Sequence, residues 1–229
     1  MLRLGHRGRI GIGRTENTAE ALQAAIAAGA DGIECDVRLD ADGVPVLFHD
    51  ASVSRVSAMR GKLSKIPTKD FLHLPLVNGG TSLLFTDLSR IVPRPAWLYC
   101  ELKEVETFAP VCSKLQTSSS LRSRVILASF RPQVLVLAKE FLPDIPRVLN
   151  TTLFPLPLRK AAFLRECARV KPWGVAFPIS QLNAKRVQWL RSQGFMVCGW
   201  DTARTKKEAQ KALKLGLDVS MTQEILSTA

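Results

Sequence analysis

The feature that most constrains the fold is a junction that recurs along the chain. A glycine separates a helix-forming stretch from an apolar run at residues 28–33 (AGADGI), 193–197 (QGFMV) and 215–219 (LGLDV). Glycine readily adopts the left-handed conformation that ends a helix, and short apolar runs are typical of buried strands. Repeated helix, glycine and strand units predict a parallel sheet covered by helices.

The number of these units narrows the choice of architecture. The pattern predicts helices at residues 17–28, 83–91, 105–118, 132–141, 158–169, 183–193 and 204–214. It predicts strands at residues 2–6, 32–37, 44–49, 97–102, 125–130, 147–150, 174–178, 196–200 and 219–222. About eight strand–helix units favour a (β/α)8 TIM barrel. We expect it to be a single domain over residues 1–229, with a doubly wound open sheet as the alternative.

One pair of predicted strands has no room for a helix between its members. The segment between Asp36 and His49 instead contains Asp42-Gly43, a strong signal for a hairpin turn. We therefore expect a β-hairpin extension after strand 2, which returns His49 to the level of Glu34 and Asp36. That level is the carboxyl-terminal rim, where the active sites of such barrels lie.

Composition excludes several classes of protein. Hydrophobic residues make up 46% and charged residues 23% of the chain, as in a globular protein. The sequence has no apolar stretch long enough to cross a bilayer and no signal-peptide pattern, so we expect a cytoplasmic protein without stable membrane insertion. The net charge of +12 is spread along the chain, and no motif supports binding to nucleic acid. The five cysteines lack metal-site spacing and are expected to be buried thiols.

Ionisable side chains gather where four predicted strands end: His6-Arg7, Glu34 and Asp36, His49-Asp50, and Glu101 with Lys103. Alternation along a strand places Glu34 and Asp36 on one face. With Glu101 at the same rim, the three carboxylates would repel one another unless a cation joined them. Oxygen ligands suit Mg²⁺ or Ca²⁺. The alternative is a set of salt bridges with Arg7 and Lys103.

Two of the three histidines belong to this group. His6 and His49 suit general acid–base chemistry near neutral pH, whereas His73 is expected at the surface of a long loop. That loop, residues 51–82, is expected to carry a short helical turn near 67–72 and to cover part of the site. The run Glu16-Asn17-Thr18 opens the first helix, where it caps the helix, faces an anion, or does both.

The order of motifs resembles the glycerophosphodiester phosphodiesterases of the PLC-like phosphodiesterase superfamily. The motifs are His-Arg-Gly, Glu-Asn-Thr, Gly-Ala-Asp-Gly-Ile-Glu-x-Asp-Val, Asp-Gly-x-Pro-Val-x-x-His-Asp and Glu-Leu-Lys. The resemblance is dense over residues 4–50, clear again at 98–103 and weaker to about residue 222.

The resemblance implies a (β/α)8 barrel, a divalent cation and a role for each residue of the site. His6 and His49 would be the acid–base pair, and Glu34, Asp36 and Glu101 would hold Mg²⁺ or Ca²⁺. Arg7 and Lys103 would bind phosphate, and Trp200 would line the substrate pocket. Ser129-Phe130 matches a strand end that is mainly structural. Supporting positions are expected at Glu16, Asn17 and Asp50.

The chain departs from the family pattern at several positions. Thr15 replaces a proline, Ser57 replaces a threonine, and Asp201-Thr202 follows Trp200 in place of Thr-Val-Asn. At the end of the last predicted strand, Thr222-Gln223 stands where the family has Thr-Asp. We expect the change after Trp200 to alter contacts with the substrate. The effect of the Thr-Gln segment stays open.

The resemblance implies hydrolysis of small glycerophosphodiesters to sn-glycerol 3-phosphate and an alcohol. One alternative is a lysophospholipase D-like activity on lysophospholipids, although no amphipathic membrane segment stands out in the sequence. Another is a catalytically silent protein that binds phosphate ligands. The alcohol head group, the cation, the separate roles of the two histidines and the oligomeric state stay open.

Overall fold

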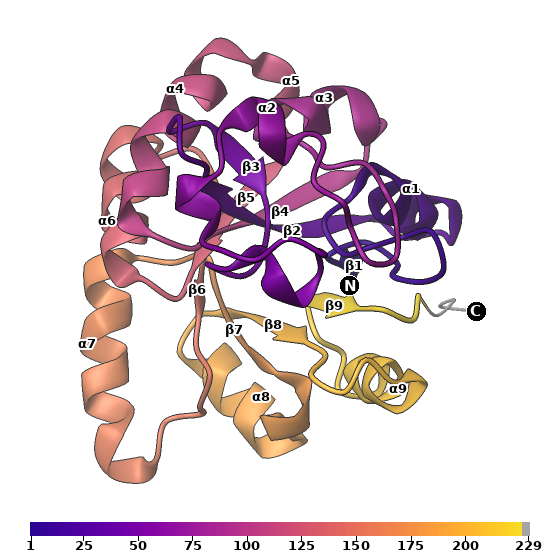
Figure 1. Cartoon of the computed structure of the whole chain (residues 1–229). Helices are drawn as coiled ribbons and strands as arrows, with labels where there is room; N and C mark the ends of the chain where they lie inside the picture. Colours follow the sequence, from indigo (N-terminus) through magenta and orange to yellow (C-terminus); the bar gives the residue numbers. More distant parts are fainter. Residues whose placement is uncertain (226–229) are drawn as a thin grey trace.

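Eight parallel strands form a closed barrel in the computed structural model, which describes residues 1–225 (Figure 1). The sheet runs in the order β1-β9-β8-β7-β6-β5-β4-β2, and β1 also pairs with β2, which closes it. The predicted barrel is confirmed, and the open sheet is wrong. The barrel strands are β1 (Leu2–His6), β2 (Gly32–Leu39), β4 (Trp97–Leu102), β5 (Val125–Ser129), β6 (Arg147–Asn150), β7 (Gly174–Pro178), β8 (Met196–Trp200) and β9 (Val219–Thr222).

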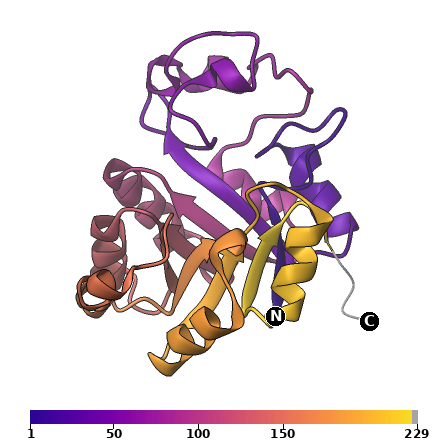
Figure 2. The same cartoon turned by 90° about the horizontal axis from the view of Figure 1, so that it is seen from below.

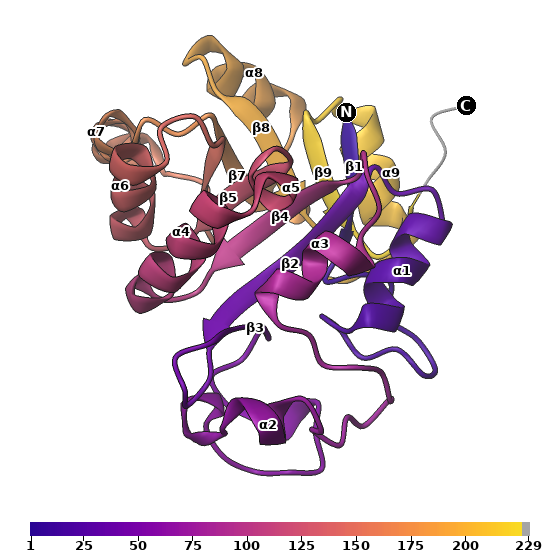
Figure 3. The same cartoon turned by 90° about the horizontal axis from the view of Figure 1, so that it is seen from above.

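Helices cover the outside of the barrel (Figure 3). They are α1 (Ala19–Ala27), α3 (Leu88–Ile91), α4 (Phe108–Thr117), α5 (Ser119–Arg122), α6 (Pro132–Phe141), α7 (Lys160–Val170), α8 (Ala184–Ser192) and α9 (Lys206–Lys214). Most of them begin and end within two residues of the predicted bounds. The helix predicted at residues 83–91 is shorter in the structure: only α3 is α-helical, and the 3-10 turn η3 (Phe85–Asp87) precedes it.

Side chains alternate between two apolar cores, one inside the barrel and one under the helices. Leu4, Tyr99 and Val148 pack inside the barrel, whereas Cys35 and Cys100 pack between the sheet and the helices. All five cysteines are buried and free of disulfides. Because Cys35 faces outward, the residues on either side of it face the barrel interior.

The predicted hairpin is present and shorter than expected. Strand β3 (Pro45–Leu47) runs antiparallel to the end of β2. The Asp40 carboxylate accepts hydrogen bonds from the backbone N–H groups of Asp42 and Val44, at 3.0 and 2.9 Å. The Phe48 N–H then donates to the Asp36 carbonyl at 2.9 Å, which brings the next residue, His49, alongside β2.

The segment after the hairpin is a packed unit rather than a long loop. It contains the 3-10 turns η1 (Val53–Arg55) and η2 (Leu63–Lys65) and helix α2 (Thr68–Phe71). These surround a separate apolar cluster of Val46, Phe48, Val53, Leu63, Ile66, Phe71 and Leu74. Figures 2 and 3 show the unit beyond the end of β2, apart from the barrel helices. The expected helical turn near 67–72 is α2.

No helix within residues 1–225 is long and apolar enough to cross a membrane. The cytoplasmic location stays a prediction.

Candidate active site

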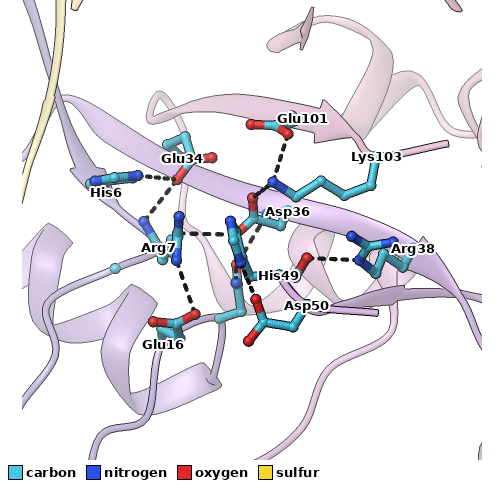
Figure 4. Close-up of polar contacts among 12 residues, drawn as sticks. His6, Arg7, Glu16, Glu34, Asp36, Arg38, His49, Asp50, Glu101 and Lys103 are labelled. Atoms are coloured by element: carbon cyan, nitrogen blue, oxygen red, sulfur yellow. Dashed lines mark hydrogen bonds and ion pairs between the residues drawn. The ribbon is translucent and has the colours of Figure 1, made fainter. Parts of the chain in front are cut away.

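A cavity of about 430 Å³ opens at the carboxyl ends of the barrel strands. Seven of the predicted site residues line it: His6, Arg7, Glu34, His49, Glu101, Lys103 and Trp200. Asp36 lies buried beside them. The residues expected from sequence therefore meet in one place, and their chemical roles stay predictions. Figure 4 shows the residues of the site, the main ones labelled, and polar contacts that join them.

The end of β1 positions the side chains of His6 and Arg7 in the site. His6 is the last residue of β1, and the backbone then turns sharply at Arg7 (φ 59°) and Gly8 (φ 83°). A Cβ atom at position 8 would lie 2.5 Å from the backbone of Ala21. The close approach of α1 to this turn therefore requires a glycine. The Arg7 N–H donates to the Glu34 carboxylate at 2.9 Å, which ties the turn to β2.

Glu34, Asp36 and Glu101 each offer a carboxylate oxygen within 4.8 Å of the others. Burial, and then the charge of Asp36, raises the pKa of Glu34 well above its usual value. Burial also raises the pKa of Glu101. Burial would raise the pKa of Asp36 too, but Lys103 and Arg7 hold it far below its usual value. A further cation would let all three carboxylates ionise together, so the residues present fit a divalent ion with oxygen ligands.

The two cationic side chains of the site lie against these carboxylates. Lys103 Nζ is 2.7 Å from Asp36 Oδ1 and 2.6 Å from Glu101 Oε1. Arg7 Nε is 3.3 Å from Asp36 Oδ2. The salt bridges expected as the alternative to a metal are therefore present, but they match three carboxylates with two cations. With all three carboxylates ionised, one negative charge would be in excess, which again suits a bound cation.

Both histidines of the site use one ring nitrogen to contact an aspartate. His49 Nδ1 is 2.6 Å from Asp50 Oδ1, and His6 Nδ1 is 2.5 Å from Asp201 Oδ1. Nε2 of His6 is 3.9 Å from the Glu34 carboxylate. An aspartate on Nδ1 fixes the ring and its tautomer. The third histidine, His73, is exposed as expected.

The protonation of His49 and Asp50 depends on their surroundings. Burial lowers the pKa of His49, and Lys103 and Arg7 lower it further against the opposing charge of Asp36. Burial would raise the pKa of Asp50, but hydrogen bonds with His49 and Arg55 lower it overall. A neutral imidazole beside an ionised carboxylate suits proton transfer near neutral pH.

The supporting residues expected from sequence link the first helix to the site. The Asn17 side-chain amide donates to Asp36 Oδ2 at 2.9 Å and accepts from the Asp36 N–H at 3.1 Å. The Glu16 carboxylate accepts from Arg7 and Arg204, at 3.1 Å each, and from Arg55. Three arginines lower the pKa of Glu16 against the effect of burial. Capping of α1 falls to Thr18, which accepts from the Ala21 N–H.

Aromatic and amide side chains complete the cavity wall. Trp200 meets Phe130 edge to face, with ring centroids 5.5 Å apart, so Phe130 lines the cavity in addition to its place at a strand end. The Asn150 side-chain amide donates to Glu101 Oε2 at 3.3 Å and accepts from Tyr99 Oη at 2.8 Å. Asn150 and Lys103 thus contact the two different oxygens of the Glu101 carboxylate.

Two departures from the family pattern meet behind His6. Besides its contact with His6, Asp201 accepts the N–H of Gln223 at 2.7 Å. The Gln223 side chain donates to the carbonyls of His6 and Gly8 and accepts from the Ile10 N–H at 2.9 Å. The expectation placed Asp201 among contacts with the substrate, whereas the structure buries it behind the histidine. The sequence gives no sign that Asp201 is a partner of His6, because the two are 195 positions apart.

Comparison with known proteins agrees with this site. The model of the Glycerophosphoryl diester phosphodiesterase family matches residues 6–111. A probable glycerophosphodiester phosphodiesterase of Mycobacterium tuberculosis is 30% identical over 172 residues, which cover 64% of this chain and 62% of that protein. The chain therefore matches less than two thirds of that relative's length. A glycerophosphodiester phosphodiesterase of Caldanaerobacter subterraneus is 24% identical over 230 residues, covering 91% of this chain and 88% of the relative.

A solved structure extends the likeness along the whole barrel. It is a phosphodiesterase of Oleispira antarctica in complex with the product sn-glycerol-3-phosphate, with a TM-score of 0.83 and 25% identity. The match covers 97% of this chain and 93% of that one. The model of the glycerophosphoryl diester phosphodiesterase family thus matches the first part of the chain, from β1 into α4, and the barrel as a whole resembles that of a solved phosphodiesterase.

Proposed function

We propose that the chain is a metal-dependent phosphodiesterase that hydrolyses glycerophosphodiesters to sn-glycerol 3-phosphate and an alcohol. We also propose that residues 1–229 act as a single domain. The observation that carries the proposal is the convergence of three buried carboxylates, two cations and two aspartate-paired histidines on one cavity. We infer that the chain belongs to the glycerophosphoryl diester phosphodiesterase family; the match of residues 6–111 to that family's model and the product held by the Oleispira relative support the substrate class.

Each polar group of the cavity has a distinct task in this reaction. Arg7 and Lys103 bind the phosphate oxygens and stabilise the charge that builds on them in the transition state. One histidine takes the proton of the attacking oxygen, which belongs to water or to the glycerol 2-hydroxyl; in the second case a cyclic phosphodiester forms, and water must then open it to give sn-glycerol 3-phosphate. The other histidine gives a proton to the alcohol oxygen as its bond to phosphorus breaks. The aspartates on Nδ1 hold each ring so that Nε2 is free to exchange that proton.

Glu34, Asp36 and Glu101 would hold the divalent cation, Mg²⁺ or Ca²⁺. When bound, the cation supplies positive charge that offsets the phosphoryl charge. Lys103 lies against two of these carboxylates, and with the cation bound its ammonium group would be free to contact a phosphate oxygen.

Turnover of glycerophosphocholine tests the proposed function directly. Purified protein with Mg²⁺ or Ca²⁺ is expected to release sn-glycerol 3-phosphate, and excess chelator is expected to stop the release because the ion supplies transition-state charge. Lysophosphatidylcholine, assayed in parallel, measures the lysophospholipase D-like alternative. Binding of sn-glycerol 3-phosphate without turnover of either substrate would instead identify a silent binding protein.

Asp201→Asn tests whether Asp201 positions His6. The substitution keeps the shape of the side chain but removes the carboxylate that fixes Nδ1–H. We expect kcat to fall at least about tenfold, by analogy with other histidines held by an aspartate. KM should change little, because Asp201 is buried behind His6 and does not line the cavity. Steady-state kinetics across pH measures both constants.

The matched control for Asp201→Asn is Asp144→Asn, an exposed aspartate that pairs with Arg122. The control should keep the kinetics of the native protein. An unchanged kcat and pH profile in Asp201→Asn would show that Asp201 is merely structural.

A further inference from the structure

Exposed apolar side chains concentrate on one face of the molecule. Among residues 1–225, twelve large hydrophobic residues are exposed, and nine of them lie in segments that follow the carboxyl ends of β-strands. Three of the nine belong to the connection after β6. The others are Ile12, Met59, Leu72, Val77, Val105 and Phe130. Large apolar residues gathered on one face of a protein mark an interaction site more often than scattered ones do.

The connection from β6 to α7, residues 151–159, is the most apolar part of this face, and we call it the leucine loop. Leu153, Leu156 and Leu158 are 74%, 67% and 99% exposed. Pro155 and Pro157 separate them and limit the freedom of the backbone. Figure 1 shows the connection leaving β6 and turning at the near end of α7, at the lower edge of the molecule.

The leucine loop is fixed to the mouth of the active-site cavity. Gln181 accepts the Phe154 N–H at 2.7 Å and donates to the Thr152 carbonyl at 2.5 Å. Gln181 and Thr152 both line the cavity. Whatever covers the three leucines therefore lies beside the entrance that the substrate uses.

Positive charge surrounds the leucine loop. Arg159 and Lys185 are exposed, Lys160 stacks on Trp189 at 4.4 Å, and Arg186 stacks on the Phe154 ring at 4.6 Å. Residues 145–200 contain nine Lys and Arg residues and one acidic residue, Glu166. The positive charge expected to be spread along the chain is thus concentrated in residues 145–200, where few acidic residues offset it.

We propose that the leucine loop docks on a lipid bilayer that carries anionic headgroups. Apolar side chains at a tip, flanked by Lys and Arg, combine burial at the headgroup boundary with attraction to anionic lipid. A second copy of the chain fits this surface less well, because it would bring a second basic surface against the first. Docking places the cavity entrance at the bilayer, so the substrate is a phosphodiester presented there. That last step rests on the proposed function, whereas docking itself does not.

Co-sedimentation with vesicles tests the proposal. The vesicles are phosphatidylcholine alone or phosphatidylcholine mixed with phosphatidylglycerol. The native protein should bind the mixed vesicles at least about tenfold more strongly, and salt should weaken the binding. The triple variant Leu153→Ser, Leu156→Ser, Leu158→Ser should lose at least about tenfold of that binding. Arg159→Ser with Lys185→Ser should reduce the preference for anionic vesicles.

The control variant is Phe141→Ser. Phe141 is an exposed aromatic residue at the carboxyl end of α6, outside the leucine loop, so this variant should bind vesicles as the native protein does. Turnover of soluble glycerophosphocholine, measured on every variant, reports the proposed function separately from docking. The proposal is overturned if the native protein shows no preference for anionic vesicles or if the triple variant binds them normally. It is also overturned if the triple variant only converts a dimer to a monomer.

Discussion

Replacing His6 or His49 with alanine is expected to lower kcat for glycerophosphocholine by at least about a hundredfold, the usual scale for an acid–base group. Each ring lines the cavity and has an aspartate oxygen within 2.6 Å of Nδ1. Removing either ring leaves one of the two proton transfers to water. KM should change less than kcat, because Arg7 and Lys103 remain to bind the phosphate.

The chain offers a matched control for the histidine variants. His73 is exposed, contacts the Lys69 carbonyl and does not line the cavity, so His73→Ala should keep normal turnover. Thermal unfolding of each variant separates lost catalysis from lost folding. Near-normal activity in both His6→Ala and His49→Ala would rule out the proposed acid–base pair.

An activated substrate distinguishes the acid from the base. A phosphodiester with an aryl leaving group needs no protonation of that group, so it should restore turnover only in the variant that lacks the acid. Burial lowers the pKa of His49, which favours its neutral form and hence the role of base. We expect the aryl substrate to rescue His6→Ala and not His49→Ala. The reverse result would exchange the two roles.

The barrel could be predicted because its signals are local. A glycine after a helix, an apolar run and a polar strand end each occupy a few adjacent residues, and their repetition limits the topology. Asp42-Gly43 fixed the hairpin in the same way, and with it the return of His49 to β2. The packed unit after the hairpin was missed because its apolar residues have no regular period and cluster only in three dimensions.

Site residues could be predicted where they belong to a local motif at the end of one strand. Contacts between residues that are far apart in the sequence could not be predicted. The sequence presents Asp201 and Gln223 as two separate departures from the family pattern. In the structure they are neighbours, with Asp201 supplying the carboxylate that holds His6 and Gln223 holding the backbone around it. The leucine loop likewise carries no motif in the sequence, since the predicted helix 158–169 includes only its last two residues, and only its exposure reveals an apolar surface.

Replacing a carboxylate of the triad with its amide is the second change with a large expected effect. Glu34→Gln, Asp36→Asn and Glu101→Gln should each lower kcat/KM at least about a hundredfold, because an amide binds a divalent cation less strongly than a carboxylate does. Thermal unfolding with and without Mg²⁺ or Ca²⁺ gives a readout besides activity. A cation that binds only the folded protein raises its melting temperature, and the rise should vanish in these variants.

The control for the triad is Glu140→Gln, an exposed carboxylate on α6, which should keep both the activity and the response to the cation. A normal cation-induced rise in melting temperature in all three triad variants would show that the ion binds elsewhere.

Glu34→Gln separates a cation ligand from a residue that merely stabilises the fold. The pKa of Glu34 is raised in the folded protein, chiefly by burial, so the stability that its protonated form contributes is lost as the pH rises through that pKa. Glutamine mimics the protonated form and can still accept the Arg7 N–H. In chelator near neutral pH, Glu34→Gln should therefore melt at or above the temperature of the native protein while lacking turnover. A lower melting temperature of Glu34→Gln in chelator would mean that ionised Glu34 stabilises the cation-free barrel. The negative charge of the three carboxylates would then be no argument for a bound metal.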